Sequence, residues 1–359
     1  AMLVAVSQTP ALNPLDSIPA ARENQQTLLK KLNAMGVLSQ EEYAQIIQTL
    51  VSINPPPPAN NEQYRAFSRL VINQLYQIYG RERVELGGFR VITSLDTALQ
   101  SAATCSLHTQ LSRLNGRIEN DPACAPAQFL PGSIPPLSIE SLLSSTTIMD
   151  PKNGEVLALV GDSNQQQENP VLSPHQAGSV LTPLIAVNAF ARGFSPASQV
   201  WDIPNNVPLA YQNKDLPASD FRGPVRLRTA LSNDYMAAIY KLNQQLGDNL
   251  LWRSAPSFGL MTAENTNNEN LLFTGPSATV LEIAQLYSTF ANLGTRYGTI
   301  MPENGQIGPT LILRIDSYNP ADSYSHIAPD AQSIVSPQLA YLVHDVLQDD
   351  YERRITLGY

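Results

Sequence analysis

Apolar residues recur every three or four positions in the first part of the chain, which is the spacing of amphipathic helices. Residues 20–36 form one such stretch, and Gly36 is placed to end it because glycine readily takes a left-handed conformation. Ser39 precedes Glu42 by three residues, a capping box that predicts the start of a second helix. A third helix is predicted over residues 67–78. The apolar positions behind these predictions are Leu28, Leu29, Leu32, Met35, Tyr43, Ile46, Ile47, Leu50, Phe67, Leu70, Val71, Leu75 and Ile78.

Four consecutive prolines, Pro55–Pro58, interrupt this helical pattern. Proline lacks a backbone N–H and favours a stiff extended conformation, so this run predicts a linker. We expect a new domain to begin at Gly87, with a β-branched strand at Phe89–Thr93 and a helix capped by Asp96.

The clearest local pattern is a β-hairpin formed by two apolar runs within residues 145–162. Asp150–Gly154 joins the runs and ends in the Asn-Gly pair that tight hairpin turns favour. Helical spacing returns at 177–192, 225–247 and 279–294, and residues 308–316 read as a strand. Strands gathered around a helical middle predict the α+β class rather than a doubly wound parallel sheet.

Composition narrows the possible functions of the 359 residues. A net charge of −9 gives no electrostatic basis for binding nucleic acid. Only five lysines are present, at positions 30, 31, 152, 214 and 241.

No apolar run reaches the 18 or so residues needed to span a bilayer, and the first residues lack the pattern of a signal peptide, so we expect a chain entered midway. No cofactor-binding motif stands out, and His108 near Cys105 offers too few ligands for a metal.

The two cysteines, Cys105 and Cys124, lie nineteen positions apart. One bridge between them and two separate buried thiols are both compatible with the composition.

Six ordered segments resemble the class A penicillin-binding proteins, which join a peptidoglycan glycosyltransferase to a transpeptidase. The first segment runs from SQTPALNPLD through an Arg-containing helix to MGVLSQEEY and resembles the closing helices of the glycosyltransferase. The second, GGFRVITSLDTALQSAA, resembles the start of the transpeptidase. TTIMDPKNGEVLALVGD is similar to that domain's first hairpin, and HQAGSVLTPLIAVNAF to its nucleophile helix. FRGPVRLRTALSNDYMAAIY and SATVLEIAQLYSTFANLG match two further segments in the family's order.

The catalytic positions implied by this resemblance are altered. The family's Ser-x-x-Lys motif places a lysine amine one helical turn from the nucleophilic serine hydroxyl, where it can accept the proton. Here the motif reads Ser179-Val180-Leu181-Thr182, so the nucleophile position is kept and the lysine position is threonine. In the family's second motif, Ser-x-Asn, Asp234 falls at the serine position and Met236 at the asparagine position. The third motif, Lys-Thr-Gly, would follow close beyond Tyr359.

The resemblance implies a penicillin-binding-protein/β-lactamase-like fold: an antiparallel sheet flanked by helices, with a helical subdomain. It divides the chain into a glycosyltransferase tail (1–54), a linker and helix (55–86) and a transpeptidase-like domain (87–359) whose C-terminal end is missing. The function it implies is peptidoglycan biosynthesis on the extracytoplasmic face of the bacterial membrane, with an anchoring segment outside this chain. Its expected partners are peptidoglycan or its precursors and other cell-wall or division proteins.

We predict that the transpeptidase-like domain is a catalytically inactive scaffold or binding module, any activity belonging to an upstream glycosyltransferase. The alternative is an active D,D-transpeptidase or carboxypeptidase that uses Ser179 with a rearranged base. His175 is the nearest such base in sequence, while Lys241 reads as a surface lysine. A purely structural protein without any active domain is a third possibility. The extracytoplasmic location favours a Cys105–Cys124 disulfide.

Overall fold

The computed structural model describes residues 17–49, 62–114, 124–129, 144–161, 171, 173–204, 221–247, 250–260, 277–302 and 304–357. The chain divides into two compact units, residues 1–62 and 63–359. The predicted proline linker and Leu50 lie outside the described residues.

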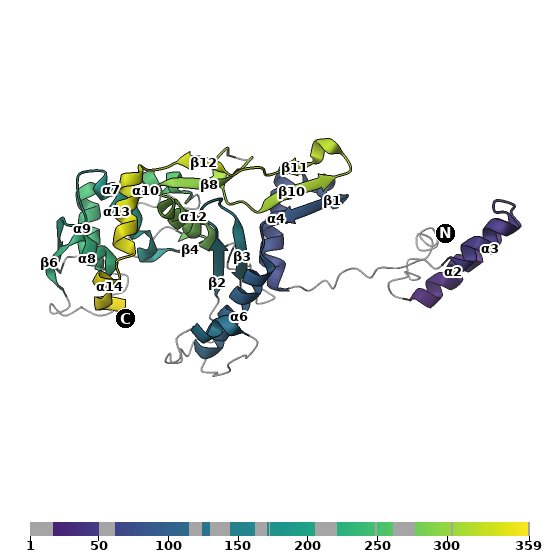
Figure 1. Ribbon diagram of the computed structural model, residues 1–359, viewed down its shortest axis with the longest axis horizontal. Helices are drawn as coiled ribbons and strands as arrows, with labels where there is room; N and C mark the ends of the chain where they lie inside the picture. Colours follow the sequence, from purple (N-terminus) through teal and green to yellow (C-terminus); the bar gives the residue numbers. More distant parts are fainter. Residues whose placement is uncertain are drawn as a thin grey trace. The chain divides into compact units, whose positions relative to one another are not determined.

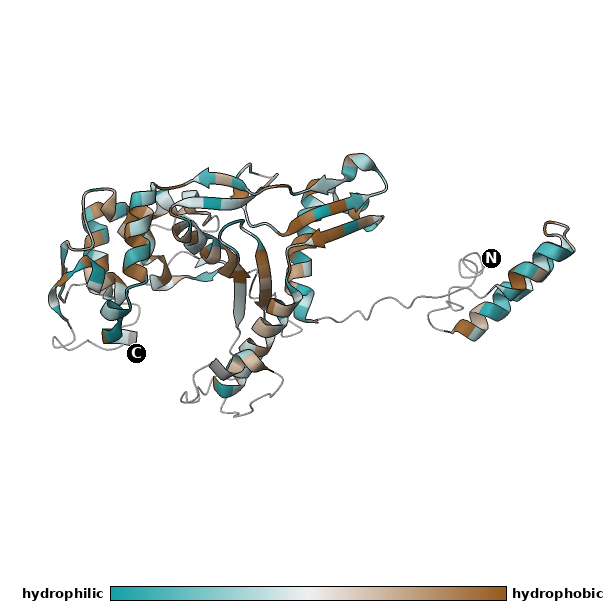
Figure 2. Cartoon of the chain, in the orientation of Figure 1, coloured by the Kyte–Doolittle hydropathy of each residue, from teal (hydrophilic) through white to brown (hydrophobic). Residues whose placement is uncertain are grey.

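Within its described residues, the first unit has the helices α2 (Ile18–Ala34) and α3 (Gln40–Gln48). Ser39 and Glu42 form the predicted capping box, each side chain bonding the other residue's backbone N–H. Gly36 follows α2 with a φ of 74°. The two helices are mostly hydrophilic along their length (Figure 2).

The second unit opens with α4 (Arg65–Tyr79), α5 (Arg81–Glu85), β1 (Phe89–Thr93) and α6 (Thr97–Leu114). Asp96 caps α6 by accepting hydrogen bonds from the Ala98 and Leu99 amides at 2.8 and 3.0 Å. The predicted hairpin is present as β2 (Ser145–Met149) and β3 (Val156–Gly161) (Figure 1).

The middle of the second unit is mainly helical. It comprises β4 (His175–Gln176), the 3-10 helix η4 (Gly178–Leu181), α7 (Thr182–Phe190), β5 (Gln199–Asp202), β6 (Gly223–Arg226), α8 (Leu227–Ser232), α9 (Met236–Leu246), α10 (Leu250–Ser254) and the 3-10 helix η6 (Ala255–Phe258). The C-terminal part comprises β7 (Ser277–Ala278), α12 (Val280–Ala291), β8 (Thr295–Ile300), β9 (Ile307–Gly308), β10 (Ile312–Ser317), β11 (Tyr324–Ser325), β12 (Asp330–Ser333), α13 (Pro337–Leu347) and α14 (Asp350–Leu357).

The strands pair antiparallel in the orders β1–β10–β11, β12–β8–β9, β2–β3, β4–β7 and β5–β6. Hydrophobic residues concentrate along β3 and on β1 and β10 (Figure 2), where they pack with α4 into one core cluster. A second and larger cluster centres on α7, which is buried along almost its whole length and packs with α8, α9, α12 and α13. Antiparallel strands with a separate helical core confirm the predicted α+β class.

Two helices predicted from apolar spacing are shorter in the structure. The stretch 177–192 begins as the 3-10 helix η4, and α7 starts only at Thr182. The stretch 225–247 begins as strand β6 and breaks between α8 and α9. Periodicity misses this break because the turn residues Asn233–Tyr235 still fit a helical spacing, although Asp234 has a φ of 56°.

Cys105 on α6 and Cys124, just before the 3-10 helix η3 (Ala125–Phe129), form a disulfide with Cα atoms 5.7 Å apart. The bridge attaches the segment around residue 124 to α6.

Candidate active site

The two positions of the first motif lie one turn apart, as the spacing predicted. Ser179 is on η4 and Thr182 is the first residue of α7, and the Thr182 amide donates a hydrogen bond to the Ser179 carbonyl. Thr182 is 8% exposed, whereas Ser179 is partly exposed. Position 182 therefore faces the packed interior beside the serine turn and carries a neutral hydroxyl there instead of an amine.

Asp234 lies on the connection between α8 and α9, and Met236 is the first residue of α9. The Tyr235 amide donates to the Ala230 carbonyl at 2.9 Å, and the Asp234 amide to the Leu231 carbonyl at 3.5 Å. These two bonds around a left-handed residue form a Schellman motif, which ends α8. Aspartate tolerates the left-handed conformation better than most residues other than glycine.

The two second-motif positions differ in environment. The Asp234 side chain is exposed. Met236 begins α9 and, like Tyr235, packs against the large core cluster. The carboxylate thus stands at the surface of the turn, while the thioether contributes to packing.

Tyr287 on α12 was not singled out by sequence reasoning, yet it touches the serine turn. Its hydroxyl donates a 2.9 Å hydrogen bond to the Val180 carbonyl, one residue after Ser179. Burial, and secondarily the charge of Asp234, raise the pKa of Tyr287 to about 12. Tyr287 is therefore a neutral donor near pH 7, and its phenolate is not available as a base. Its helical position gave no hint of this contact, because Val180 lies 107 positions away.

His175, the residue considered as a substitute base, lies on the two-residue strand β4. It pairs with Ala278 of β7, and its side chain is exposed. Lys241 lies on α9, beyond the break that separates this helix from Asp234, so the two residues do not share a helix face.

Across the described ranges, no three His, Cys, Asp or Glu side chains gather as a metal site would require. Among the same residues, no helix is both long enough and apolar enough to cross a bilayer.

A model of the penicillin-binding protein transpeptidase domain matches residues 144–353, more than half of the chain. The chain belongs to this family, which confirms the resemblance drawn from its motifs. Penicillin-binding protein 1B of Vibrio cholerae is 24% identical over 305 residues, covering 82% of this chain and 37% of that protein. Penicillin-binding protein 1A of Clostridium perfringens is 24% identical over 373 residues, covering 91% of this chain and 50% of that protein. The chain thus spans half or less of the length of these relatives.

Solved structures show the same fold. The crystal structure of penicillin-binding protein 1A from Haemophilus influenzae aligns with a TM-score of 0.65 at 17% identity, covering 96% of this chain and 66% of that chain. The penicillin-binding protein PonA1 from Mycobacterium tuberculosis aligns with a TM-score of 0.58 at 18% identity, covering 78% of this chain and 68% of that chain.

Proposed function

We propose that this chain is a transpeptidase-like domain of peptidoglycan synthesis that has lost its acyl-transfer chemistry and serves as a scaffold or binding module. The observation that carries the proposal is Thr182, which stands one turn from Ser179 where a lysine base is required. A threonine hydroxyl is neutral near pH 7 and cannot accept the serine proton as an amine can.

The second motif supports the same conclusion. Asp234 brings a negative charge to a position where the family has a serine hydroxyl, and Met236 has no amide with which to hydrogen-bond a substrate. A carboxylate near a peptide's terminal carboxylate repels it. Losing the base in comparable serine enzymes lowers the rate by about 10⁴-fold or more.

Tyr287, the described side chain that contacts the serine turn, does not replace the missing base. The raised pKa of Tyr287 keeps its hydroxyl protonated, and that hydroxyl already donates a hydrogen bond to the Val180 carbonyl. His175 lies on a short surface strand, four residues before Ser179, and is the residue on which the alternative of an active D,D-transpeptidase or carboxypeptidase depends.

The domain arrangement belongs to the same proposal. We assign residues 1–54 to the end of a glycosyltransferase domain, 55–86 to a linker and helix, and 87–359 to the transpeptidase-like domain. The helical unit formed by α2 and α3 supports the first assignment. In this arrangement any enzymatic activity comes from the glycosyltransferase, and the protein works at the extracytoplasmic face of the membrane, held there by a segment outside this chain. Its binding partners are peptidoglycan or its precursors and other cell-wall or division proteins.

Substrate turnover and cell-wall binding test the two halves of the proposal separately. Full-length protein and its Ser179→Ala variant are incubated with a D-alanyl-D-alanine pentapeptide, and released D-alanine is measured. We expect the two proteins to release D-alanine at the same background rate and to sediment equally with insoluble peptidoglycan. D-alanine release that disappears in Ser179→Ala would establish the active alternative, and failure to sediment would refute peptidoglycan as the partner.

A further inference from the structure

A pocket of about 410 Å³ lies where β1 begins and β10 ends. It is lined by residues 88–90 and 316–318, and we call it the Tyr318 pocket. The two strands pair antiparallel there (Figure 1), with Arg90 opposite Asp316. Ligand pockets in proteins span roughly 300–1,000 Å³, so the space is sufficient for a small ligand. None of its lining residues belongs to the serine turn or to the second motif, so its chemistry is separate from theirs.

The Tyr318 pocket occupies the solvent side of the β1–β10 pair. Side chains alternate between the two faces of a strand. Phe89 and Val91 pack with α4 in a core cluster. Arg90 and its cross-strand partner Asp316 therefore face the other way. Tyr318 continues this alternation two residues after Asp316, and it is 95% exposed. An arginine, an aspartate and an uncovered aromatic ring thus stand on one face.

Arg83 fixes both walls of the pocket from behind. Its guanidinium donates a 2.9 Å hydrogen bond to the Gly87 carbonyl, directly before the first wall. It also donates to the Ser317 hydroxyl at 3.1 Å and to the Asp322 carboxylate at 3.0 Å, on either side of Tyr318. One cation therefore holds both walls in place without a ligand. A preformed site of this kind loses little conformational entropy on binding.

The ring of Tyr318 rests on the backbone of the opposite wall. A Cβ atom on Gly88 would come within 3.3 Å of the ring, so only glycine allows this approach without displacing it. Gly88 also has a φ of 85°, a conformation that side chains with a Cβ rarely adopt. Tyrosine offers a large and rigid contact surface with a polar tip, which suits it to recognition. The fold thus supports this ring on one side and leaves the rest of it uncovered.

The charges on this face leave one cation in excess. Arg314 binds Asp316 with two parallel hydrogen bonds of 2.7 and 3.0 Å, which satisfies the aspartate charge. Within the described part of the chain, Arg90 forms no hydrogen bond or ion pair of its own. Its guanidinium can therefore bind a carboxylate on a ligand.

We propose that the Tyr318 pocket binds a saccharide that carries a carboxylate. The apolar face of a pyranose ring stacks on Tyr318, the Asp316 oxygens accept hydrogen bonds from its hydroxyl groups, and Arg90 pairs with the carboxylate. The glycan strand of peptidoglycan, with its acidic stem peptides, has this chemistry. The choice of peptidoglycan as the saccharide rests on the proposed function.

Sedimentation with graded amounts of insoluble peptidoglycan tests the pocket in the full-length protein. Tyr318→Ala should raise the apparent dissociation constant about fivefold, because the stacked ring is lost. Tyr318→Trp keeps a ring that can stack and should bind at least as tightly as the wild type. Arg90→Gln should weaken binding, and the difference from the wild type should shrink as salt screens the charge. Soluble glycan strands freed of stem peptides by an amidase should compete away the part of the binding that depends on Tyr318, whereas free stem peptide should not.

Tyr351→Ala is the matched control, since it removes another tyrosine, 73% exposed, from α14 of the same unit. It should bind like the wild type. Wild-type sedimentation that Tyr318→Ala leaves unchanged, or an equal loss in Tyr351→Ala, would overturn the pocket while the proposed function stands. Competition by free stem peptide instead of glycan would overturn the saccharide assignment. Failure of the wild type itself to sediment would refute the proposed partner and, with it, this inference.

Discussion

At position 234, a glycine variant should be more stable than an alanine variant, which is the reverse of their order in the middle of a helix. A left-handed backbone costs about 1–2 kcal/mol per residue for side chains that bear a Cβ, with Asp and Asn among the exceptions that tolerate it. Glycine avoids that cost but loses roughly 0.5–1 kcal/mol through its more flexible unfolded state. Because Asp234 has a φ of 56° and an exposed side chain, backbone conformation should dominate the effect. We expect Asp234→Gly to be more stable than Asp234→Ala by about 1 kcal/mol.

The free energy of unfolding in urea, followed by circular dichroism, measures this difference. Asn73, exposed in the middle of α4, is the control position, where alanine should be more stable than glycine by about 1 kcal/mol. If alanine equals or exceeds glycine at Asp234 as well, the turn is not left-handed, and the separation of α8 from α9 is wrong.

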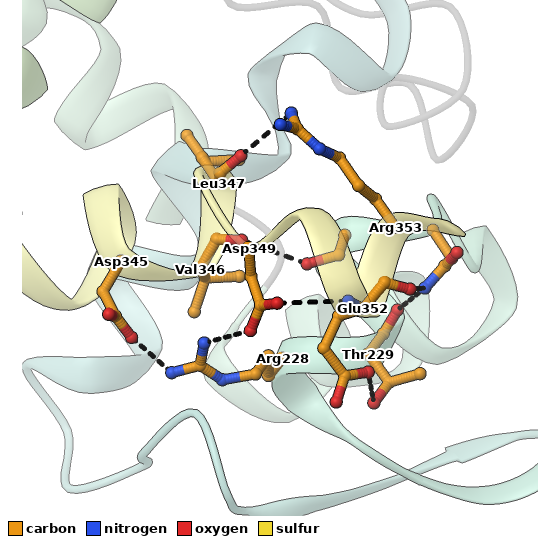
Figure 3. Close-up of polar contacts among 10 residues, drawn as sticks. Arg228, Thr229, Asp345, Val346, Leu347, Asp349, Glu352 and Arg353 are labelled. Atoms are coloured by element: carbon orange, nitrogen blue, oxygen red, sulfur yellow. Dashed lines mark hydrogen bonds and ion pairs between the residues drawn. The ribbon is translucent and has the colours of Figure 1, made fainter. Parts of the chain in front are cut away.

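Three further predictions concern chemistry, covalent stability and pH. Thr182→Lys alone should remain almost inert toward penicillin, because catalytic residues act as a unit. Adding Asp234→Ser and Met236→Asn should measurably accelerate acylation of the full-length protein. A single variant that is acylated fast would refute the second-motif assignment. Cys124→Ser should lower the free energy of unfolding by about 3 kcal/mol, and non-reducing peptide mapping of natively exported protein should recover the linked pair rather than two free thiols. The hydrogen bond from the Glu352 backbone, together with the Arg228 guanidinium (Figure 3), lowers the pKa of Asp349. Its carboxylate therefore stabilises the packing of α14 above about pH 4, and this effect is lost as pH falls through the lowered pKa. Hydrogen-exchange protection of α14 should drop at acidic pH in the native protein and show no such step in Asp349→Asn.

Local signals in the sequence predicted the local structure well. The Ser39–Glu42 capping box, the Asp96 cap and the hairpin at Asp150–Gly154 all involve residues within a few positions of one another, where backbone geometry follows directly from residue type. The fold class followed from the order of these elements.

The contacts that shape the site are long-range and were not predicted. Asn233 meets Glu352 across 119 positions, and Tyr287 meets Val180 across 107. Periodicity describes which face of a helix is apolar, but it does not say which polar group a tyrosine or asparagine will find after folding. Periodicity also failed to predict the helix break at Asp234, because a single left-handed residue leaves the apolar spacing on either side almost unchanged.

The identity of the site residues came from motif resemblance rather than from pattern. Ser179 alone looks like an ordinary residue at the start of a helix. Its comparison with the Ser-x-x-Lys motif drew attention to Thr182, and the structure then placed the two one turn apart.

Covalent trapping by a β-lactam tests the central claim, loss of acyl transfer, most directly. Full-length protein is incubated with excess benzylpenicillin, and its intact mass is followed over time beside that of the Ser179→Ala variant. The account predicts that the mass of both proteins stays unchanged. A stoichiometric gain of one penicillin mass, located on Ser179 by peptide mapping and absent from Ser179→Ala, would contradict it.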